Sequence, residues 1–189
     1  MSSYVIRRAK EYDLGSLMRL VSELGDHEQS KATITEDVLR RDGLSGNGSR
    51  LKIYVVEYFP SCDTKEAGQQ GEGSVVGFGA VHDMYNILHG PIAFLCGLYV
   101  DEDHRGKKLG KALMKAAAKD CVDCGYGSMD WDILSEDAGT KTFYTGIGAR
   151  DLTDSLGRDY MRFFLPDMQK FTSDMNVVCR GDATISIEL

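Results

Sequence analysis

The stretch Ile92–Lys119, IAFLCGLYVDEDHRGKKLGKALMKAAAK, decides the fold of this chain. An apolar run over residues 92–100 predicts a strand, and DEDH and RGKKLG then lead into a helix that we expect to end near Cys124. The first N–H groups of a helix have no partner inside the helix and carry partial positive charge, so a helix start of this kind attracts anions. The stretch therefore predicts a strand–turn–helix unit with an anion site at its turn.

Basic residues are concentrated at this helix start, in a chain whose net charge is −7. The segment 105–119 contains no acidic residue and six basic ones, which are Arg105, Lys107, Lys108, Lys111, Lys115 and Lys119. Gly106 and Gly110 lack a Cβ atom, so the backbone there can approach a bulky anion. The pattern favours a polyphosphate ligand, although an amphipathic surface helix with solvated lysines would have the same composition. RGKKLG matches neither G-x-x-x-x-G-K-[ST] nor G-x-G-x-x-G.

Three segments resemble one known family. V-D-E-D-H-R-G-K-K-L-G-K-A-L-M-K is similar to the acetyl-CoA pyrophosphate loop, [QR]-x-x-G-x-[GA], of the GNAT superfamily of N-acetyltransferases. Arg105 and Gly110 match this pattern; Lys108 stands at its middle glycine, a replacement that we expect to be tolerated if the residue keeps a helical φ. T-F-Y-T-G-I-G-A at 142–149 resembles the family's F-Y segment. The start, YVIRRAKEYDLGSLMRLVSELGDHE, resembles the diamine (spermidine/spermine) acetyltransferases and their thialysine-acetylating relatives.

The resemblance implies an α/β fold, a GNAT-type mixed, mostly antiparallel twisted sheet flanked by helices. We expect a single N-acetyltransferase domain over residues 1–166 and a C-terminal extension of unknown structure over 167–189. Hydrophobic periodicity, caps and turn residues predict the remaining elements. The expected strands are 4–8, 50–59, 75–82, 127–134 and 158–165, and the expected helices run from an N-cap at Asp13 to Gly25, from a capping box at Thr33–Glu36 to Asp42, and over 139–148.

Composition narrows the class of protein. With 189 residues, 42% hydrophobic and 27% charged, the chain can bury one sizeable core. No apolar run approaches the ~20 residues that span a bilayer, so we expect a cytoplasmic protein with no membrane partner. The acidic balance argues against nucleic acid as a partner. Cys121 and Cys124 form a lone C-x-x-C without a second pair, so no metal site is expected and the five cysteines are interpreted as reduced thiols.

The resemblance also assigns the coenzyme contacts. It places the pyrophosphate of acetyl-CoA on Arg105, Gly106, Lys107, Lys108, Leu109, Gly110 and Lys111, and the pantetheine arm along Leu98, Tyr99 and Val100 in strand fashion. Asp137 stands where the family usually has an asparagine that contacts the coenzyme. An anion there either weakens coenzyme binding or caps the following helix.

Tyr144 is the candidate catalytic acid. F-Y at 143–144 matches the register at which the family places a tyrosine whose hydroxyl reaches the coenzyme sulfur. A phenol is neutral at pH 7 and can donate a proton to the departing thiolate without first being charged. The alternative is a core tyrosine stacked between helix and sheet.

The general base is not evident from the sequence. The diamine acetyltransferases have an acidic pair in the strand segment where this chain has Cys96 and Gly97. Gly97 suits a strand bulge that frees backbone groups for the acetyl carbonyl. Cys96 could act as a nucleophile, but a small apolar filler is the favoured interpretation because buried free cysteine commonly has that role.

Other acidic residues could bind the acceptor amine. Asp130 and Asp132 alternate with Trp131, so on a strand both would point to one face, where they could line a cleft or simply be solvated. Glu28 matches an acceptor-contacting residue of the resembling enzymes, and His27 replaces their tyrosine.

The resemblance therefore implies an acetyl-CoA-dependent homodimeric enzyme that acetylates a primary amine of a small molecule (a diamine, polyamine or lysine analogue) by direct transfer. Because this chain has fewer candidate carboxylates than the diamine acetyltransferases, we expect it to prefer a shorter or singly charged amine to spermine. Two alternatives remain open, a weakly catalytic acyl-CoA sensor or interaction module, and an acetyltransferase of protein lysines or N-termini.

Overall fold

The structure is a computed structural model that describes residues 2–46, 48–60, 73–153, 177–178 and 184–185. The chain divides into two units, Met1–Ile147 and Gly148–Leu189, and each is described by itself. In the second unit, β6 (Val177–Val178) and β7 (Thr184–Ile185) pair antiparallel. The strand predicted over 158–165 lies outside the described residues, and the domain limit at residue 166 stays a prediction.

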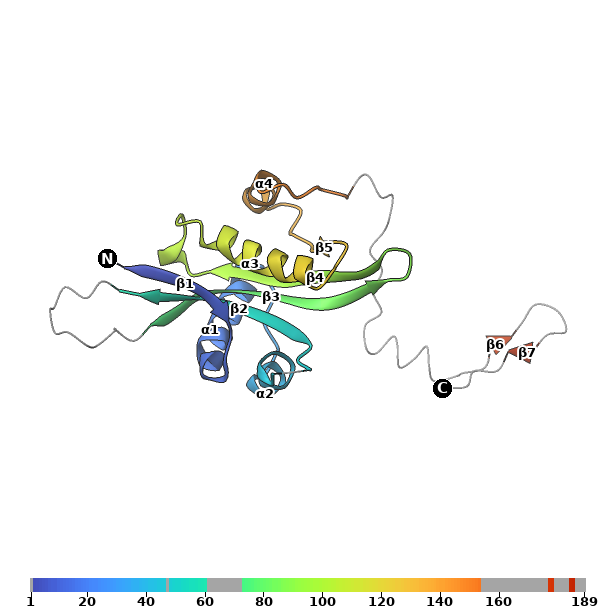
Figure 1. Cartoon of the computed structure of the whole chain (residues 1–189), viewed down its shortest axis with the longest axis horizontal. Coiled ribbons are helices and arrows are strands. Elements are labelled where there is room, and N and C mark those ends of the chain that lie inside the picture. Colours follow the sequence, from blue (N-terminus) through green and yellow to red (C-terminus); the bar gives the residue numbers. More distant parts are fainter. Residues whose placement is uncertain (1, 47, 61–72, 154–176, 179–183, 186–189) are drawn as a thin grey trace. The chain divides into compact units, whose positions relative to one another are not determined.

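The first unit is built on a five-stranded sheet in the order β1-β2-β3-β4-β5 (Figure 1). The first four strands pair antiparallel, and β5 pairs parallel to β4, so the predicted mixed, mostly antiparallel sheet is confirmed. The strands are β1 (Ser3–Arg8), β2 (Leu51–Phe59), β3 (Ser74–Asn86), β4 (Gly90–Val100) and β5 (Met129–Asp130).

Helices cover both faces of this sheet. In Figure 1, α1 and α2 lie below the sheet and α3 above it, with α4 beyond β5 on the side of α3. The helices are α1 (Leu14–His27), α2 (Glu36–Leu39), which continues as a π-turn over Arg40–Leu44, α3 (Leu109–Asp123) and α4 (Ala138–Gly146). Short 3₁₀ turns occupy Glu11–Asp13 and Glu102–His104.

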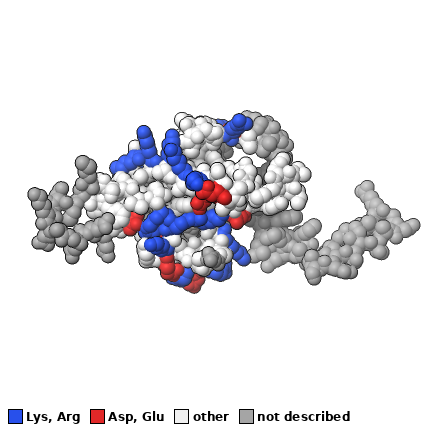
Figure 2. Space-filling view, in the orientation of Figure 1, with Lys and Arg blue, Asp and Glu red and all other residues white. Residues whose placement is uncertain are grey.

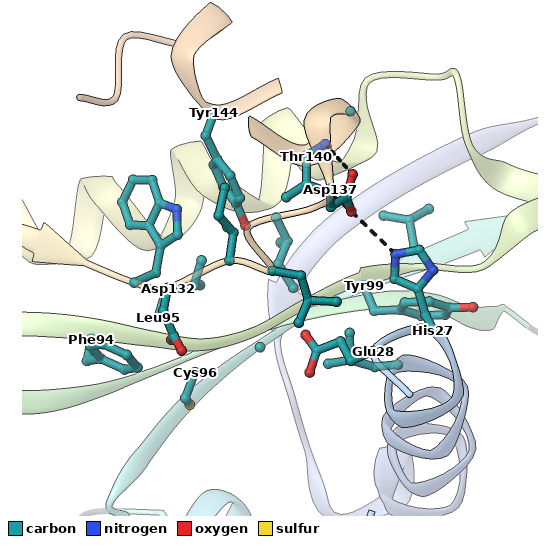
Figure 3. A pocket seen from close by; sticks show the side chains of 18 of the residues that line it. His27, Glu28, Phe94, Leu95, Cys96, Tyr99, Asp132, Asp137, Thr140 and Tyr144 are labelled. Atoms are coloured by element: carbon teal, nitrogen blue, oxygen red, sulfur yellow. Dashed lines mark hydrogen bonds and ion pairs between the residues drawn. The ribbon is translucent and has the colours of Figure 1, made fainter. Parts of the chain in front are cut away.

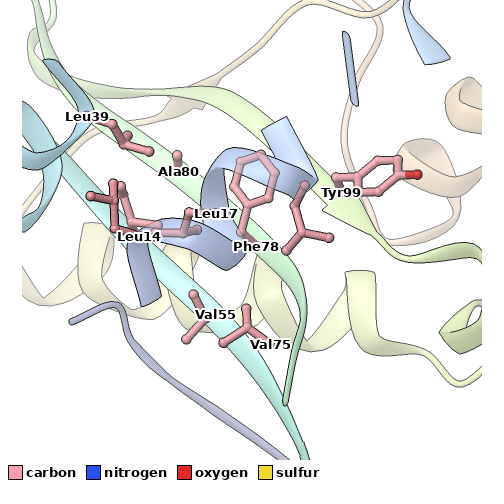
Figure 4. Close-up of a cluster of buried hydrophobic side chains, with 10 residues drawn as sticks. Leu14, Leu17, Leu39, Val55, Val75, Phe78, Ala80 and Tyr99 are labelled. Carbon is pink, nitrogen blue, oxygen red and sulfur yellow. The ribbon is translucent and has the colours of Figure 1, made fainter. Parts of the chain in front are cut away.

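Alternating side chains of the strands make two apolar layers. Below the sheet, the leucines of α1 pack on β2 and β3 in a cluster that includes Leu17, Val55 and Phe78 (Figure 4). Above it, the buried face of α3 is formed by Leu109, Leu113, Met114, Ala117 and Cys121. Leu17, Val55 and Leu113 are at most 1% exposed, and truncating a leucine of this kind to alanine typically costs about 2–5 kcal/mol. These two apolar layers therefore stabilise the packing of α1 and α3 on the sheet that contains the strand–turn–helix stretch.

Asp13 does not cap α1 with its side chain, contrary to the expectation. Its carboxylate is 2% exposed and accepts two hydrogen bonds from the Arg7 guanidinium at 2.7 and 2.9 Å, and one from the Lys10 N–H at 2.7 Å. Glu57 binds the same guanidinium at 2.6 Å. A buried carboxylate requires such partners, so Asp13 joins β1, β2 and the start of α1 instead of serving the helix alone.

Two other local predictions need correction. The cap of α2 is Thr35, whose hydroxyl accepts from the Val38 N–H, and not Thr33. The strand expected over 127–134 is reduced to Met129–Asp130, because the chain leaves the sheet after two paired residues. The hairpin strands β3 and β4 instead extend beyond the predicted limits.

Within the described residues, no helix is long and apolar enough to cross a bilayer. The same part of the chain holds no group of three or more His, Cys, Asp or Glu side chains that could bind a metal ion. Cys96, Cys121 and Cys124 are free thiols, and Cys62 and Cys179 lie outside the described residues.

Candidate active site

A cavity of about 780 Å³ opens between the end of α1, the second half of β4, the segment that follows β5, and α4 (Figure 3). It brings together residues that are up to 120 positions apart in the chain. Its lining residues are Leu24, His27, Glu28, Phe94–Val100, Arg105, Trp131–Leu134, Asp137, Gly139, Thr140 and Tyr144.

The cavity exists because β4 and β5 separate. In the described part of the chain they pair only at Ala93–Met129 and Phe94–Asp130, so from Leu95 onward no described strand lies beside this edge of β4. The N–H of Asp101 donates to Val76 O across the other edge. Because backbone groups alternate along an antiparallel strand, those of Leu98 and Val100 face the open edge. A strand edge with unpaired N–H and C=O groups can accept a further extended chain.

A bulge interrupts β4 at the cavity. Ala80 pairs with Gly97 and Val81 pairs with Leu95, so Cys96 is the extra residue. The Cys96 thiol donates to Ala80 O at 3.4 Å, and its partial burial in the cavity wall raises its pKa. A thiol with a raised pKa forms less thiolate, which opposes a nucleophilic role. A Cβ atom on Gly97 would lie 3.1 Å from the Phe78 ring, so this position favours a residue without a side chain.

The start of α3 is shaped by two residues with positive φ. Gly106 has φ +76°, and a Cβ atom built there would meet no atom within 4 Å. Lys108, the N-cap, has φ +63°, so the helical φ that was the condition for tolerating a lysine here is not met. A glycine, as the family pattern has at this position, would adopt the left-handed conformation without strain. Here a lysine adopts it, which costs about 1–2 kcal/mol of conformational free energy.

The basic residues at this helix start have different surroundings. The Arg105 guanidinium donates from Nε to Val100 O at 3.0 Å and from Nη1 to Glu102 at 3.1 Å, and it lies over the Tyr99 ring. Lys107 Nζ donates to Asp103 O at 2.8 Å. Arg105 lines the cavity, while the side chains of Lys107 and Lys108 are exposed outside it. Figure 2 shows Lys and Arg side chains gathered over α3.

Tyr144, on the buried face of α4, reaches the cavity from the side opposite α1 (Figure 3). It is 8% exposed, and its ring contacts the Trp131 ring with 4.8 Å between centroids. Burial, and then the negative charge of Glu28, raise the pKa of Tyr144 to about 12. The phenol thus stays protonated across the neutral range, as a proton donor must. Its buried ring also satisfies the core-tyrosine interpretation, and one side chain can serve both roles.

Asp137 caps α4 and is also part of the cavity wall. It accepts hydrogen bonds from the Thr140 hydroxyl at 2.6 Å and from the Thr140 N–H at 2.9 Å, which together with nearby His27 lower its pKa. His27 Nε2 lies 3.8 Å from Asp137 Oδ2. The helix-capping alternative for Asp137 therefore holds, and the two residues that depart from the family pattern at 27 and 137 face each other.

The predicted acidic residues are separated by the structure. Glu28, at the end of α1, and Asp132, just after β5, both line the cavity. Asp130 does not line it; its exposed carboxylate accepts a hydrogen bond from Ser128 at 2.9 Å. The expectation that Asp130 and Asp132 share one face required a longer strand than β5 provides.

Sequence reasoning missed Thr140, Phe94 and Leu24 in the cavity wall. The sequence signal for the cap is Asp137 itself, because aspartate is a preferred N-cap residue, and Thr140 gives no signal of its own. Leu24 and Phe94 carry no such signal, because apolar residues of a helix and a strand look alike whether they line a cavity or a core.

The comparisons with known proteins agree with this geometry. A model of the Acetyltransferase (GNAT) family matches residues 52–149, from β2 to just past α4. Thialysine N-epsilon-acetyltransferase of Sus scrofa is 30% identical over 165 residues, which cover 86% of this chain and 94% of that protein. Spermidine/spermine N(1)-acetyltransferase-like protein 1 of Homo sapiens is 24% identical over 86% of this chain, but this match covers only 23% of that protein.

Solved structures share the fold. An integron cassette protein from V. cholerae aligns with a TM-score of 0.66 at 21% identity, covering 91% of this chain and 99% of its own. Ribosomal-protein-alanine N-acetyltransferase from Brucella melitensis biovar Abortus 2308 aligns with a TM-score of 0.61 at 17% identity, covering 85% and 100%. The family match and the 30% identity over most of both chains decide the assignment: the chain belongs to the GNAT family and is an N-acetyltransferase.

Proposed function

We propose that this enzyme transfers an acetyl group from acetyl-CoA directly to a primary amine of a small cationic molecule. The observation that carries the proposal is the cavity itself, because the open edge of β4, the Tyr144 hydroxyl and three carboxylates meet in it. Thialysine N-epsilon-acetyltransferase at 30% identity supports a lysine-like acceptor with a single reacting amine.

The chain fits acetyl-CoA at two places. The turn 105–108 and the first N–H groups of α3 suit a pyrophosphate, because they combine an open backbone at Gly106 with flanking cations. The open edge of β4 suits the amides of a pantetheine arm, through Leu98 and the N–H of Val100. Val100 O is already used by Arg105, so we propose one contact fewer than a free strand edge would offer.

The chemistry needs a neutral amine and a proton for the departing thiolate. An alkylamine has a pKa of about 10.4 and is mostly charged at pH 7, so it must lose a proton before it attacks. Tyr144 is proposed as the acid, because its hydroxyl faces the cavity and its pKa of about 12 keeps it protonated. Glu28 and Asp132 are proposed to attract the cationic acceptor, and His27 borders their site.

A thiol-release assay tests the proposal. Purified chain with acetyl-CoA is offered thialysine, lysine, spermidine, spermine, histamine and short peptides, and the free thiol of CoA is measured. We expect turnover with thialysine or lysine and weaker turnover with spermine. Coenzyme binding by calorimetry without thiol release from any amine would instead indicate an acyl-CoA sensor, and selective turnover of peptides would indicate a protein acceptor.

The homodimer implied by the resemblance and the cytoplasmic location expected from the apolar pattern are also part of the proposal. Light scattering after size-exclusion chromatography tests the first, and imaging of the tagged chain in its host cell tests the second.

A further inference from the structure

We infer that Glu28 is the general base that takes the proton from the acceptor ammonium, an inference that rests on the proposed function. The resembling diamine enzymes have their acidic pair on the strand at the positions of Cys96 and Gly97. Neither residue can accept that proton here, because Cys96 is a thiol that donates to Ala80 O and Gly97 has no side chain. The base must therefore come from another element of the cavity.

The last turn of α1 lies on the bulge of β4. A Cβ atom on Gly97 would be 3.6 Å from Leu24 Cδ2, so Leu24 packs directly on the bulge. Glu28 follows one turn later on the same side of the helix, and its N–H donates to Leu24 O at 2.9 Å. Figure 3 shows the Glu28 carboxylate entering the cavity from the end of α1, with Tyr144 on the opposite side and Asp132 between Tyr144 and Cys96. The carboxylate that β4 lacks is thus supplied by the helix that covers the bulge.

The other titratable groups of the cavity are less suited to the role. Asp137 accepts two hydrogen bonds from Thr140, and His27 Nε2 is directed at Asp137. Arg105 has no acceptor lone pair for a proton and is bound to Val100 O and Glu102. These groups belong to the walls of the cavity and to its coenzyme side.

Asp132 is the serious competitor, because its carboxylate also lines the cavity. Glu28 stands one turn after Leu24, which packs on the bulge that lacks the acidic pair, whereas Asp132 belongs to the segment that follows β5. The charge of Glu28 also contributes to the raised pKa of Tyr144, in agreement with this choice. Asp132 is left with the attraction of the acceptor's cationic end.

The proton balance is as follows. Glu28 takes one proton from R–NH₃⁺ and later releases it to water. The lone pair of the resulting R–NH₂ forms the C–N bond with the thioester carbon while the C–S bond breaks. Tyr144 gives its proton to the sulfur and regains one from the nitrogen, which loses its second proton as the amide forms. The products are the acetylated amine, the free thiol and one proton.

The test compares two acceptors that differ only in the reacting amine. One carries an alkylammonium group, and the other carries an aminooxy group, which is uncharged at pH 7 and needs no base before attack. Glu28→Gln should lower kcat/KM for the alkylammonium acceptor by about 10²–10⁴-fold, the usual contribution of a positioned base. With the aminooxy acceptor, the same variant should stay within a few-fold of the wild-type enzyme.

Asp26→Asn is the matched control, because it removes the same charge from the same end of α1 and lines a different cavity. Circular dichroism and calorimetry with acetyl-CoA check that Glu28→Gln folds and binds the coenzyme. An equal loss with both acceptors would overturn the inference in favour of a binding role for Glu28, and a selective loss in Asp132→Asn instead would move the base to Asp132. If the wild-type enzyme acetylates the alkylammonium acceptor and Glu28→Gln does so equally fast, the inference about Glu28 is wrong but the proposed function stands. If the wild-type enzyme acetylates no amine at all, the proposed function is wrong as well.

Discussion

The two ends of the cavity differ in whether backbone groups or side chains are available to bind a ligand. At the proposed coenzyme end, the useful groups belong to the backbone of the open β4 edge and of the turn before α3. At the proposed acceptor end they are side chains, contributed by the end of α1, the segment after β5 and the start of α4. A backbone site tolerates replacement of its side chains as long as the conformation is kept, and a side-chain site does not. This explains how Lys108 can stand at a glycine position, and why specificity is expected to reside at the acceptor end.

Tyr144→Phe should give the largest effect, because it removes the acid from the junction of the two ends. We expect turnover to fall by about 10²–10⁴-fold, the scale of one positioned acid, while acetyl-CoA affinity measured by calorimetry is retained. Because the pKa of Tyr144 is raised to about 12, its phenol stays protonated and able to donate at every pH below that value. Deprotonation of Tyr144 should therefore reduce the activity of the wild-type enzyme only as the pH approaches about 12. A variant that turns over as fast as the wild-type enzyme would assign Tyr144 to the core alone.

Reversing Lys107 and Lys108 to Glu tests the coenzyme end. An exposed pair of opposite charges contributes about 0.2–1 kcal/mol, and each reversal replaces an attraction with a repulsion, so the double variant should weaken acetyl-CoA binding by about tenfold in calorimetry. The loss should shrink at high salt, because exposed charges are screened. The control is Lys115→Glu with Lys119→Glu, which changes the net charge equally but lies beyond the first turn of α3. Equal losses in both pairs would mean that overall charge, and not this turn, attracts the coenzyme.

Asp132→Asn tests the acceptor end with a smaller change. An exposed ion pair contributes about 0.2–1 kcal/mol, so KM for a cationic acceptor should rise by up to about fivefold, with kcat retained. Asp130→Asn, two residues earlier and outside the cavity, should leave KM as it is. A rise in KM from Asp130→Asn alone would place the acceptor elsewhere on the surface.

Lys108→Gly should have the smallest effect on activity. It also tests most directly whether backbone or side chains bind the coenzyme. Relief of the positive φ should raise the free energy of unfolding by about 1 kcal/mol, measured in denaturant, with little change in coenzyme affinity. Gly106→Ala should act in the opposite direction, because alanine would be strained at φ +76° although space for its Cβ is available. If Lys108→Gly instead abolished coenzyme binding, the lysine side chain and not the backbone would hold the anion.

The sequence predicts the structure around the proposed coenzyme end better than the structure around the proposed acceptor end. The strand 92–100 and the helix after it are evident because a long apolar run, an acidic turn and a glycine-containing basic segment follow one another within one continuous stretch. The site at their junction needs no contact from a distant part of the chain. The left-handed φ of Lys108 could not be predicted, since a lysine carries no signal of a left-handed conformation.

The acceptor end depends on packing that no local pattern encodes. Glu28 and Tyr144 lie 116 positions apart and meet only because α1 and α4 border the same gap. The alternation of Asp130 and Asp132 suggested a strand, but pairing ends at Asp130, because the chain there leaves β4 and turns toward α4. Asp13 was likewise predicted to cap α1, but its carboxylate instead accepts hydrogen bonds from Arg7 on β1.

The open edge of β4 also affects how this protein behaves at high concentration. Unpaired strand edges are templates on which other chains can add and begin to aggregate. Here the unpaired groups of Leu98 lie inside a cavity bordered by the end of α1 and by Tyr144, and Arg105 covers Val100 O. A slender linear molecule can reach such a recessed edge, but the rim of a second sheet cannot. The fold thereby leaves this edge open to a slender ligand without offering it to neighbouring copies.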